Sequence, residues 1–193
     1  RVYWNYMGRR PPAPALSPSQ LRDSIVNARR MAGIVDSLAG TGIPRATYMP
    51  FPFQIVQGGG NILFVYTYAS TNRLVNMGEP IVPPVDTWMG QSNGRWDGDT
   101  LVIEVTGNND QTWFDRAGNH HSALMKVTER YTLVSDNHIQ YEATIEDPET
   151  FSEPWTIRMP LYKRIEPNAQ LLEFKCVEFS EELLYGDLTK KTE

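Results

Sequence analysis

The chain has 193 residues, of which 40% are hydrophobic and 21% are charged, and its net charge is −5. This composition fits one globular domain and excludes a disordered chain; its short apolar runs exclude membrane-spanning helices. Residues 1–50 hold seven basic and two acidic side chains, a balance of +5, which leaves −10 for the remainder. The few arginines come without a nucleic-acid-binding motif, so we expect no nucleic-acid partner.

Residues 1–17 are predicted to form an extended arm. Pro11, Pro12 and Pro14 favour a polyproline II conformation and exclude a helix. Three aromatic side chains precede these prolines, and aromatic rings in a coil segment need a surface on which to dock. Docking on the same chain and docking on a partner subunit are both open interpretations.

Residues 18–42 are predicted to form an amphipathic helix and the turn that ends it. Ser17 fits the N-cap position, and Pro18 fits the first position of the helix. Apolar residues then recur at spacings of three and four, which places them on one face. Gly40 and Gly42 are typical of a helix end.

Residues 43–193 are predicted to form a β-domain, because from residue 53 the hydrophobic period becomes two. The short connectors carry glycine, asparagine and aspartate, which are typical of tight hairpins. Such strands predict an antiparallel up-and-down meander that closes into a lipocalin-like barrel or a curled half-barrel, with a sandwich as the alternative. The predicted strands cover residues 53–57, 62–68, 73–77, 87–96, 100–106, 124–134, 138–146, 155–163 and 171–179.

The segment 107–122 joins two strongly alternating strands but is far longer than a hairpin loop, and long loops in compact domains are often functional. In a structural interpretation, its polar residues cap turns while Trp113 and Phe114 plug the end of the barrel. A metal-binding interpretation uses Asn108, Asp110, Asp115 and a histidine. Because neither EF-hand nor zinc spacing is met, we expect no metal and no cofactor.

A catalytic interpretation of the same loop takes His120 or His121 as general base, oriented by Asp110 or Asp115, with Arg130 or Arg95 steadying an anion. Adjacent histidines in an extended segment point to opposite faces, so at most one of His120 and His121 enters a given site. Glu129 is the unusual member of the apolar face of the strand at 124–134. A carboxylate that points inward needs either a buried arginine partner or a ligand.

A ligand-binding interpretation rests on aromatic residues near strand and loop ends. Filling the core is the ordinary role of tryptophan, but together these rings would also line a cavity for a flat or apolar ligand. No nucleophile-elbow, metalloprotease, P-loop or dinucleotide motif occurs. The expected ligand-binding residues are Trp88, Arg95, Trp96, Asp110, Trp113, His120, Arg130 and Trp155.

Several motifs follow one another in a specific order: PFQIVQ at 52–57, WMG at 88–90, GRWDGDTLV at 94–102, His121-Ser122 with Glu129-Arg130, and IEDP at 145–148 with Pro154-Trp155. This ordered set resembles a widespread group of uncharacterised bacterial proteins, many of them exported. The likeness covers about residues 43–180 and implies a shared β fold and a periplasmic or extracellular location, but no reaction. The group often has a cysteine just before the sequence at 42–45, and this chain lacks it, so a disulfide to Cys176 is not expected. A start at Arg1 fits a cleaved secretory precursor, a proteolytic product or a chosen boundary of the chain, and the sequence does not separate these alternatives.

Three functional hypotheses follow. The first is binding of a small apolar or aromatic molecule in a barrel cavity without turnover. The second is a cofactor-free barrel enzyme of the isomerase, cyclase or lyase type, with His121 and either Asp115 or Glu129 as acid and base. The third is an accessory subunit of a larger assembly, held by residues 1–17.

Overall fold

The computed structural model describes residues 2–5, 41–115 and 117–172. The predicted helix before Gly40, most of the predicted arm and nearly all of the predicted strand at 171–179 lie outside these residues. None of the helices in the described part of the chain is long and apolar enough to cross a membrane.

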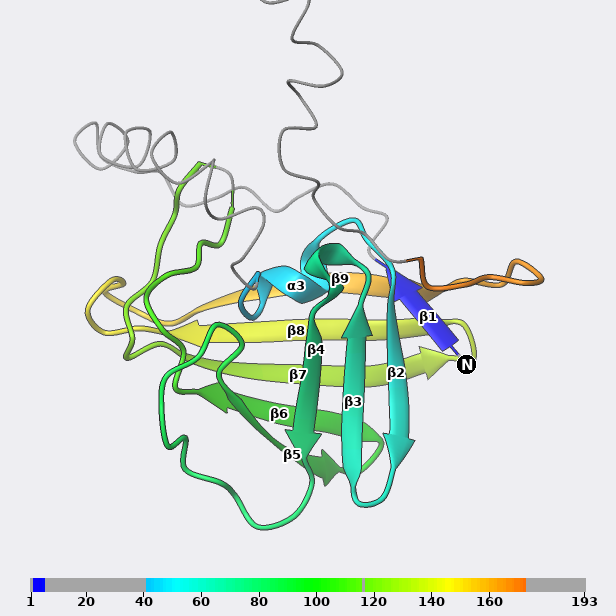
Figure 1. Cartoon of the computed structure of the whole chain (residues 1–193), viewed down its shortest axis with the longest axis horizontal. Helices are drawn as coiled ribbons and strands as arrows, with labels where there is room; N and C mark the ends of the chain where they lie inside the picture. The colour runs from blue at the N-terminus through cyan, green and yellow to red at the C-terminus, as the bar shows by residue number, and fades with distance from the viewer. Residues whose placement is uncertain (1, 6–40, 116, 173–193) are drawn as a thin grey trace, which may run out of the picture.

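Eight strands form one mostly antiparallel sheet that curls into a half-barrel, which confirms the predicted mainly β fold (Figure 1). The strands are β2 (Phe53–Gly58), β3 (Asn61–Tyr66), β4 (Asn72–Asn76), β5 (Gln91–Asp97), β6 (Thr100–Thr106), β7 (Lys126–Ser135), β8 (His138–Glu146) and β9 (Trp155–Lys163). Buried residues alternate along β3, β7 and β8 and place one face of the sheet inside, as the period of two requires.

The short strand β1 (Val2–Asn5) joins the two outer strands of this sheet. It pairs antiparallel with β2 through three residue pairs and with β9 through two, so the strand order closes on itself. Four residues of the predicted arm therefore dock on their own chain.

The strand order follows the sequence, but one neighbouring pair is parallel. β4 and β5 meet only at Val75 with Ser92 and at Asn76 with Asn93. The predicted strand at 87–96 begins later than expected, at Gln91, because Gly90 has a φ of +63° and breaks the extended backbone. The connection from residue 77 to residue 90 is thus long enough to return β5 beside β4 in the same direction.

Aromatic side chains fill the space enclosed by the sheet. Figure 1 shows β2, β3 and β4 running across β6, β7 and β8. Phe53, Phe64 and Tyr66 from the first group are fully or nearly fully buried, as are Tyr131 and Tyr141 from the second. Across the two groups, the rings of Phe64 and Tyr131 lie 5.4 Å apart between centroids. The short helix α3 (Arg45–Tyr48), which was not predicted from the sequence, adds Ala46 and Thr47 to the buried residues.

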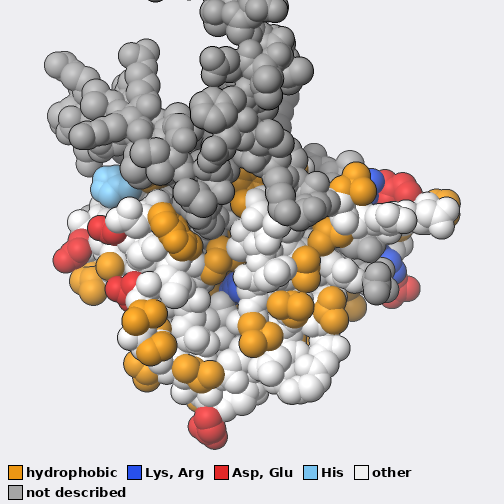
Figure 2. Space-filling view, in the orientation of Figure 1, with side chains coloured by type: hydrophobic (Ala, Val, Ile, Leu, Met, Phe, Trp, Pro, Cys, Tyr) orange, Lys and Arg blue, Asp and Glu red, His pale blue; other side chains and the backbone are white. Residues whose placement is uncertain are grey.

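The outer face of β2–β4 carries hydrophobic residues. Val56, Leu63 and Leu74 lie side by side in the register of the three strands, and Figure 2 shows hydrophobic side chains over this part of the surface. On β5–β9 the outer face instead carries ion pairs, such as Arg158 with Glu142 at 3.1 Å.

Candidate functional site

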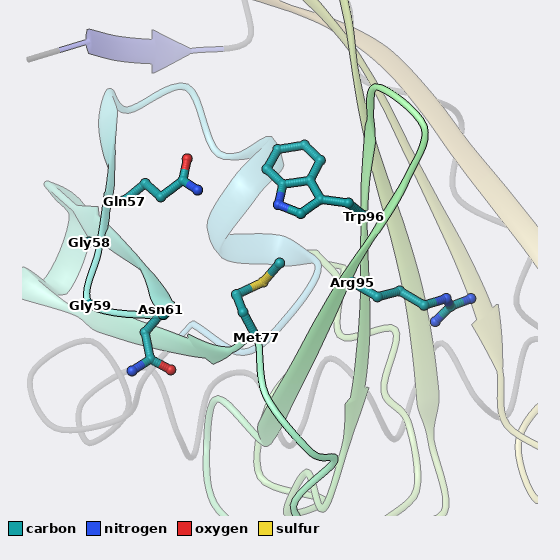
Figure 3. Close-up of a pocket in the computed structure, with 8 residues that line it drawn as sticks. Gln57, Gly58, Gly59, Asn61, Met77, Arg95 and Trp96 are labelled. Carbon is teal, nitrogen blue, oxygen red and sulfur yellow. The ribbon is translucent and has the colours of Figure 1, made fainter.

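An open pocket of about 360 Å³ lies where β2, β4 and β5 reach one end of the half-barrel (Figure 3). Three separate segments of the chain form it: the β2–β3 hairpin, the residue after β4, and the second half of β5. Its lining consists of Gln57, Gly58, Gly59, Gly60, Asn61, Met77, Arg95 and Trp96.

The hairpin side of the pocket consists of the bare backbone of three glycines between the side chains of Gln57 and Asn61. Gly59 and Gly60 have φ values of +60° and +78°, the geometry of a type I′ turn, in which glycine is favoured at both central positions. A Cβ atom on either glycine would meet no atom within 4 Å, so the hairpin tip stands clear of other side chains.

The opposite side of the pocket is apolar. Trp96 is 53% exposed, and Figure 3 shows its indole ring and the Met77 side chain directed toward one another across the pocket. A Cβ atom on Gly94 would lie 2.5 Å from Met77 Sδ, so only glycine at this position lets Met77 lie against the backbone of β5. Arg95 points to the other side of β5 (Figure 3), where its guanidinium donates to Glu104 Oε1 at 2.8 Å.

A buried polar cluster lies deeper in the half-barrel. On β4, Arg73 and Val75 point inward before Met77, at the alternating positions of a strand. Arg73 forms an ion pair with Glu129 of β7, and neither side chain is more than 1% exposed. Its Nε donates to Ser92 Oγ at 2.7 Å.

Two tyrosines complete the shell around Glu129. The hydroxyl groups of Tyr131 and Tyr141 donate to Glu129 Oε1 at 3.0 Å and 2.7 Å. Burial, reinforced by the Glu129 charge, raises the pKa of both hydroxyls well above the ordinary value, which keeps them protonated as donors. Burial alone would lower the pKa of Arg73, but the Glu129 carboxylate raises it above its ordinary value. The cluster is therefore a charged, fully enclosed part of the core.

The inward position of Glu129 agrees with the prediction from the sequence, and Arg73 supplies the arginine partner that one of its two interpretations required. Arg73 itself was not among the predicted site residues. The sequence nevertheless indicates that Arg73 points inward, because the alternation in the strand at 73–77 places it on the same face as Val75.

His121 is enclosed in the loop at 107–122 and is only 2% exposed. Its Nδ1–H donates to the Ser122 carbonyl at 2.9 Å, so Nε2 has no hydrogen and accepts from Thr112 Oγ1 at 2.5 Å. Burial lowers the pKa of His121, which favours this neutral form. Both ring nitrogens are thus used within the protein.

Asp115 caps a turn in the same loop. Its Oδ1 accepts from the backbone N–H of Ala117 at 2.8 Å, and its Oδ2 accepts from Asn119 Nδ2 at 2.6 Å. Within the described residues, no hydrogen bond or ion pair connects His121, Asp115 and Glu129, whose partners form three separate sets. The described residues also contain no group of three or more potential ligands that could hold a metal ion.

Of the eight expected ligand-binding residues, Arg95 and Trp96 line the pocket. Trp155 packs on Phe114 with ring centroids 5.3 Å apart, and Phe114 is buried, as a plug at the end of the barrel would be. The remaining expected residues lie elsewhere: Arg130 pairs with Asp97, Asp110 accepts from Gln111, Trp113 and His120 form an isolated β-bridge, and Trp88 is half-buried in the loop before β5.

Gln57, Met77 and the hairpin glycines line the pocket but were not predicted from the sequence as ligand-binding residues. Their only signal was their position at strand ends.

Comparisons of the chain with known protein families, with curated proteins and with solved structures find no match. The resemblance to a group of exported bacterial proteins therefore stays a prediction.

Proposed function

We propose that the protein binds a small, flat, apolar or aromatic molecule in the pocket formed by the β2–β3 hairpin, Met77 and Trp96. The observation that carries this proposal is the half-exposed indole of Trp96, which faces Met77 across an open space. Leaving a tryptophan ring and a methionine side chain in contact with water is unfavourable, and a bound ring removes both surfaces from water. A flat ligand fits because the indole offers a face on which it can stack.

The chemistry of the lining favours a neutral ligand. Arg95 is the one charged residue among the eight described lining residues, and its guanidinium is directed away from the pocket toward Glu104. Figure 3 shows the Gln57 amide extending toward Trp96, so a polar substituent can find a hydrogen-bonding partner at the rim. The volume of about 360 Å³ is near the lower end of the range of about 300–1,000 Å³ for ligand pockets, which favours a small molecule.

The same lining supports binding without turnover. The eight described lining residues are glutamine, asparagine, glycine, methionine, arginine and tryptophan, and they include no histidine, cysteine, aspartate or glutamate. General acid–base catalysis needs a group whose pKa is near the working pH and which reaches the substrate. His121, Asp115 and Glu129 are not among the lining residues.

A fluorescence titration with N-phenyl-1-naphthylamine, a neutral aromatic dye, tests the proposal. We expect saturable binding of one dye molecule per chain. Replacing Trp96 by Ala should weaken binding roughly 10- to 100-fold, because burial of a large apolar side chain is worth about 1.5–3 kcal/mol. Since Trp96 is half-exposed, its truncation should leave the fold intact, which circular dichroism can verify.

Leu124→Ala is the matched control, because Leu124 is 60% exposed and does not line the pocket. This variant should bind the dye as the unmodified protein does. Absence of saturable binding, or equal losses in the Leu124→Ala and Trp96→Ala variants, would contradict the proposal.

A further inference from the structure

The pocket occupies a place in the sheet where a strand is missing. β4 ends at Asn76, which pairs with Asn93 of β5 on one side and with Asn61 of β3 on the other. β5 continues for four more residues, to Asp97, while the β2–β3 hairpin projects beyond Asn61 on the far side of the gap. Two strand spacings, about 9–10 Å, therefore separate the two backbones across the gap.

The chain after β4 is held away from this gap. The Asn76 side chain accepts from the N–H of Gly78 at 3.2 Å and donates to the Glu79 carbonyl at 2.6 Å. Asn93 makes two further bonds at 2.9 Å each, to the N–H and the carbonyl of Ile81. These bonds fix the connection on the outer side of the sheet, so the gap beside the end of β5 stays open.

The register of β5 determines which backbone groups face the gap. Its hairpin to β6 has two loop residues, and Gly98 at the first of them has a φ of +58°, the geometry of a type II′ turn. Such a turn closes on a hydrogen-bonded pair, here Asp97 and Thr100, and hydrogen-bonded and non-hydrogen-bonded pairs alternate along an antiparallel ladder. Arg95 therefore bonds to β6, whereas the N–H and C=O of Trp96 point to the opposite side, into the gap.

Among the described residues, Trp96 has no backbone or side-chain hydrogen-bonding partner on that side, because the pairing of β4 with β5 stops at Asn93. Trp96 thus offers the pocket a backbone donor and a backbone acceptor next to its own indole ring. A ligand that stacks on Trp96 lies within reach of both groups.

We propose that the ligand carries an amide-type edge, a hydrogen-bond donor beside an acceptor, which pairs with the N–H and C=O of Trp96 as a neighbouring strand would. Its ring packs between Trp96 and Met77. The inference rests on the proposed function and narrows the ligand class to aromatic lactams and primary amides, or to a short peptide in which an aromatic residue presents its own N–H and C=O on one side. Exposed strand edges are a common site of such pairing.

The test compares two ligands of nearly the same shape by isothermal titration calorimetry. 2-Quinolinone has an N–H beside its carbonyl, and coumarin has a ring oxygen in place of the N–H. We expect 2-quinolinone to bind about tenfold more tightly, because coumarin leaves the Trp96 carbonyl without a donor. Equal affinities would overturn the amide edge but leave the proposed function intact, whereas failure of both ligands and of the naphthylamine dye would overturn the proposed function.

Hydrogen exchange measured by NMR gives an independent readout. In the free protein, the amide of Trp96 should exchange fast while those of Arg95 and Asp97 are protected by β6, and 2-quinolinone should slow the exchange of Trp96. A Trp96 amide that is already protected in the free protein would refute the inference. N-acetyl-phenylalanine methylamide distinguishes a peptide ligand from a lactam ligand. If it binds more tightly than 2-quinolinone, the ligand is a peptide, and if it binds more weakly, the ligand is a lactam.

Discussion

Replacing Glu129 by Gln should destabilise the fold strongly, because it keeps the shape of the side chain but removes its charge. Arg73, at most 1% exposed, would then be a buried cation without its counterion. Breaking a buried ion pair by removing one partner costs about 3–5 kcal/mol. The total stability of a domain is about 5–15 kcal/mol, so this one change should remove a large share of it.

Glu104→Gln is the matched control, because it makes the same chemical change in an exposed ion pair. Glu104 accepts from Arg95 at 2.8 Å, and the two side chains are 39% and 59% exposed. Exposed pairs contribute about 0–1 kcal/mol, so this variant should unfold almost as the unmodified protein does. The difference between the two variants isolates the effect of burial.

Urea unfolding followed by circular dichroism measures both effects. With an m-value of about 2 kcal/mol per M, the Glu129→Gln midpoint should fall by roughly 2 M. The double variant Arg73→Met/Glu129→Gln should recover part of this loss, because it removes the unpaired cation. If Glu129→Gln costs no more than Glu104→Gln, or if the double variant is the least stable, the reasoning from an enclosed, desolvated pair is refuted.

Three further outcomes are expected. Since burial lowers the pKa of His121, the contribution of His121 to stability should be complete above about pH 6.5 and decrease as the pH falls toward the lowered pKa. The difference between the urea midpoints at pH 7.5 and pH 5.5 should therefore be smaller in His121→Gln than in the unmodified protein. Burial acts to raise the pKa of Asp147, but hydrogen bonds from the Ser122 hydroxyl and N–H lower it below its ordinary value. The contribution of Asp147 to the stability of the fold should therefore be present above about pH 3.9 and be lost as the pH falls through the lowered pKa. In urea unfolding, Asp147→Asn should cost roughly 1.5–3 kcal/mol at pH 7 and almost nothing near pH 2. Gly42→Ala should lower the stability by about 1–3 kcal/mol in thermal unfolding, because Gly42 has a φ of +68° and a Cβ there would lie 2.5 Å from Thr112 Oγ1; an unchanged melting temperature would contradict this.

The sequence by itself determined most of the strands. The predicted strands at 100–106, 138–146 and 155–163 coincide with β6, β8 and β9, because alternating hydrophobicity and turn residues act over a few neighbouring positions. The same alternation is sufficient to place Glu129 on the inner face of its strand, where the side chain is fully buried.

Only the tertiary structure decided what these strands bring together. Arg73 and Glu129 are 56 positions apart, and no local pattern shows that an inward arginine and an inward glutamate meet. The loop at 107–122 offered His121 and Asp115 as catalytic groups, but packing gave each its own partners within the protein. The pocket depends on where β4 stops relative to β5, which is set by long-range pairing and by a connection that turns away at Asn76. Such contacts join distant parts of the chain, and local periodicity contains no information about them.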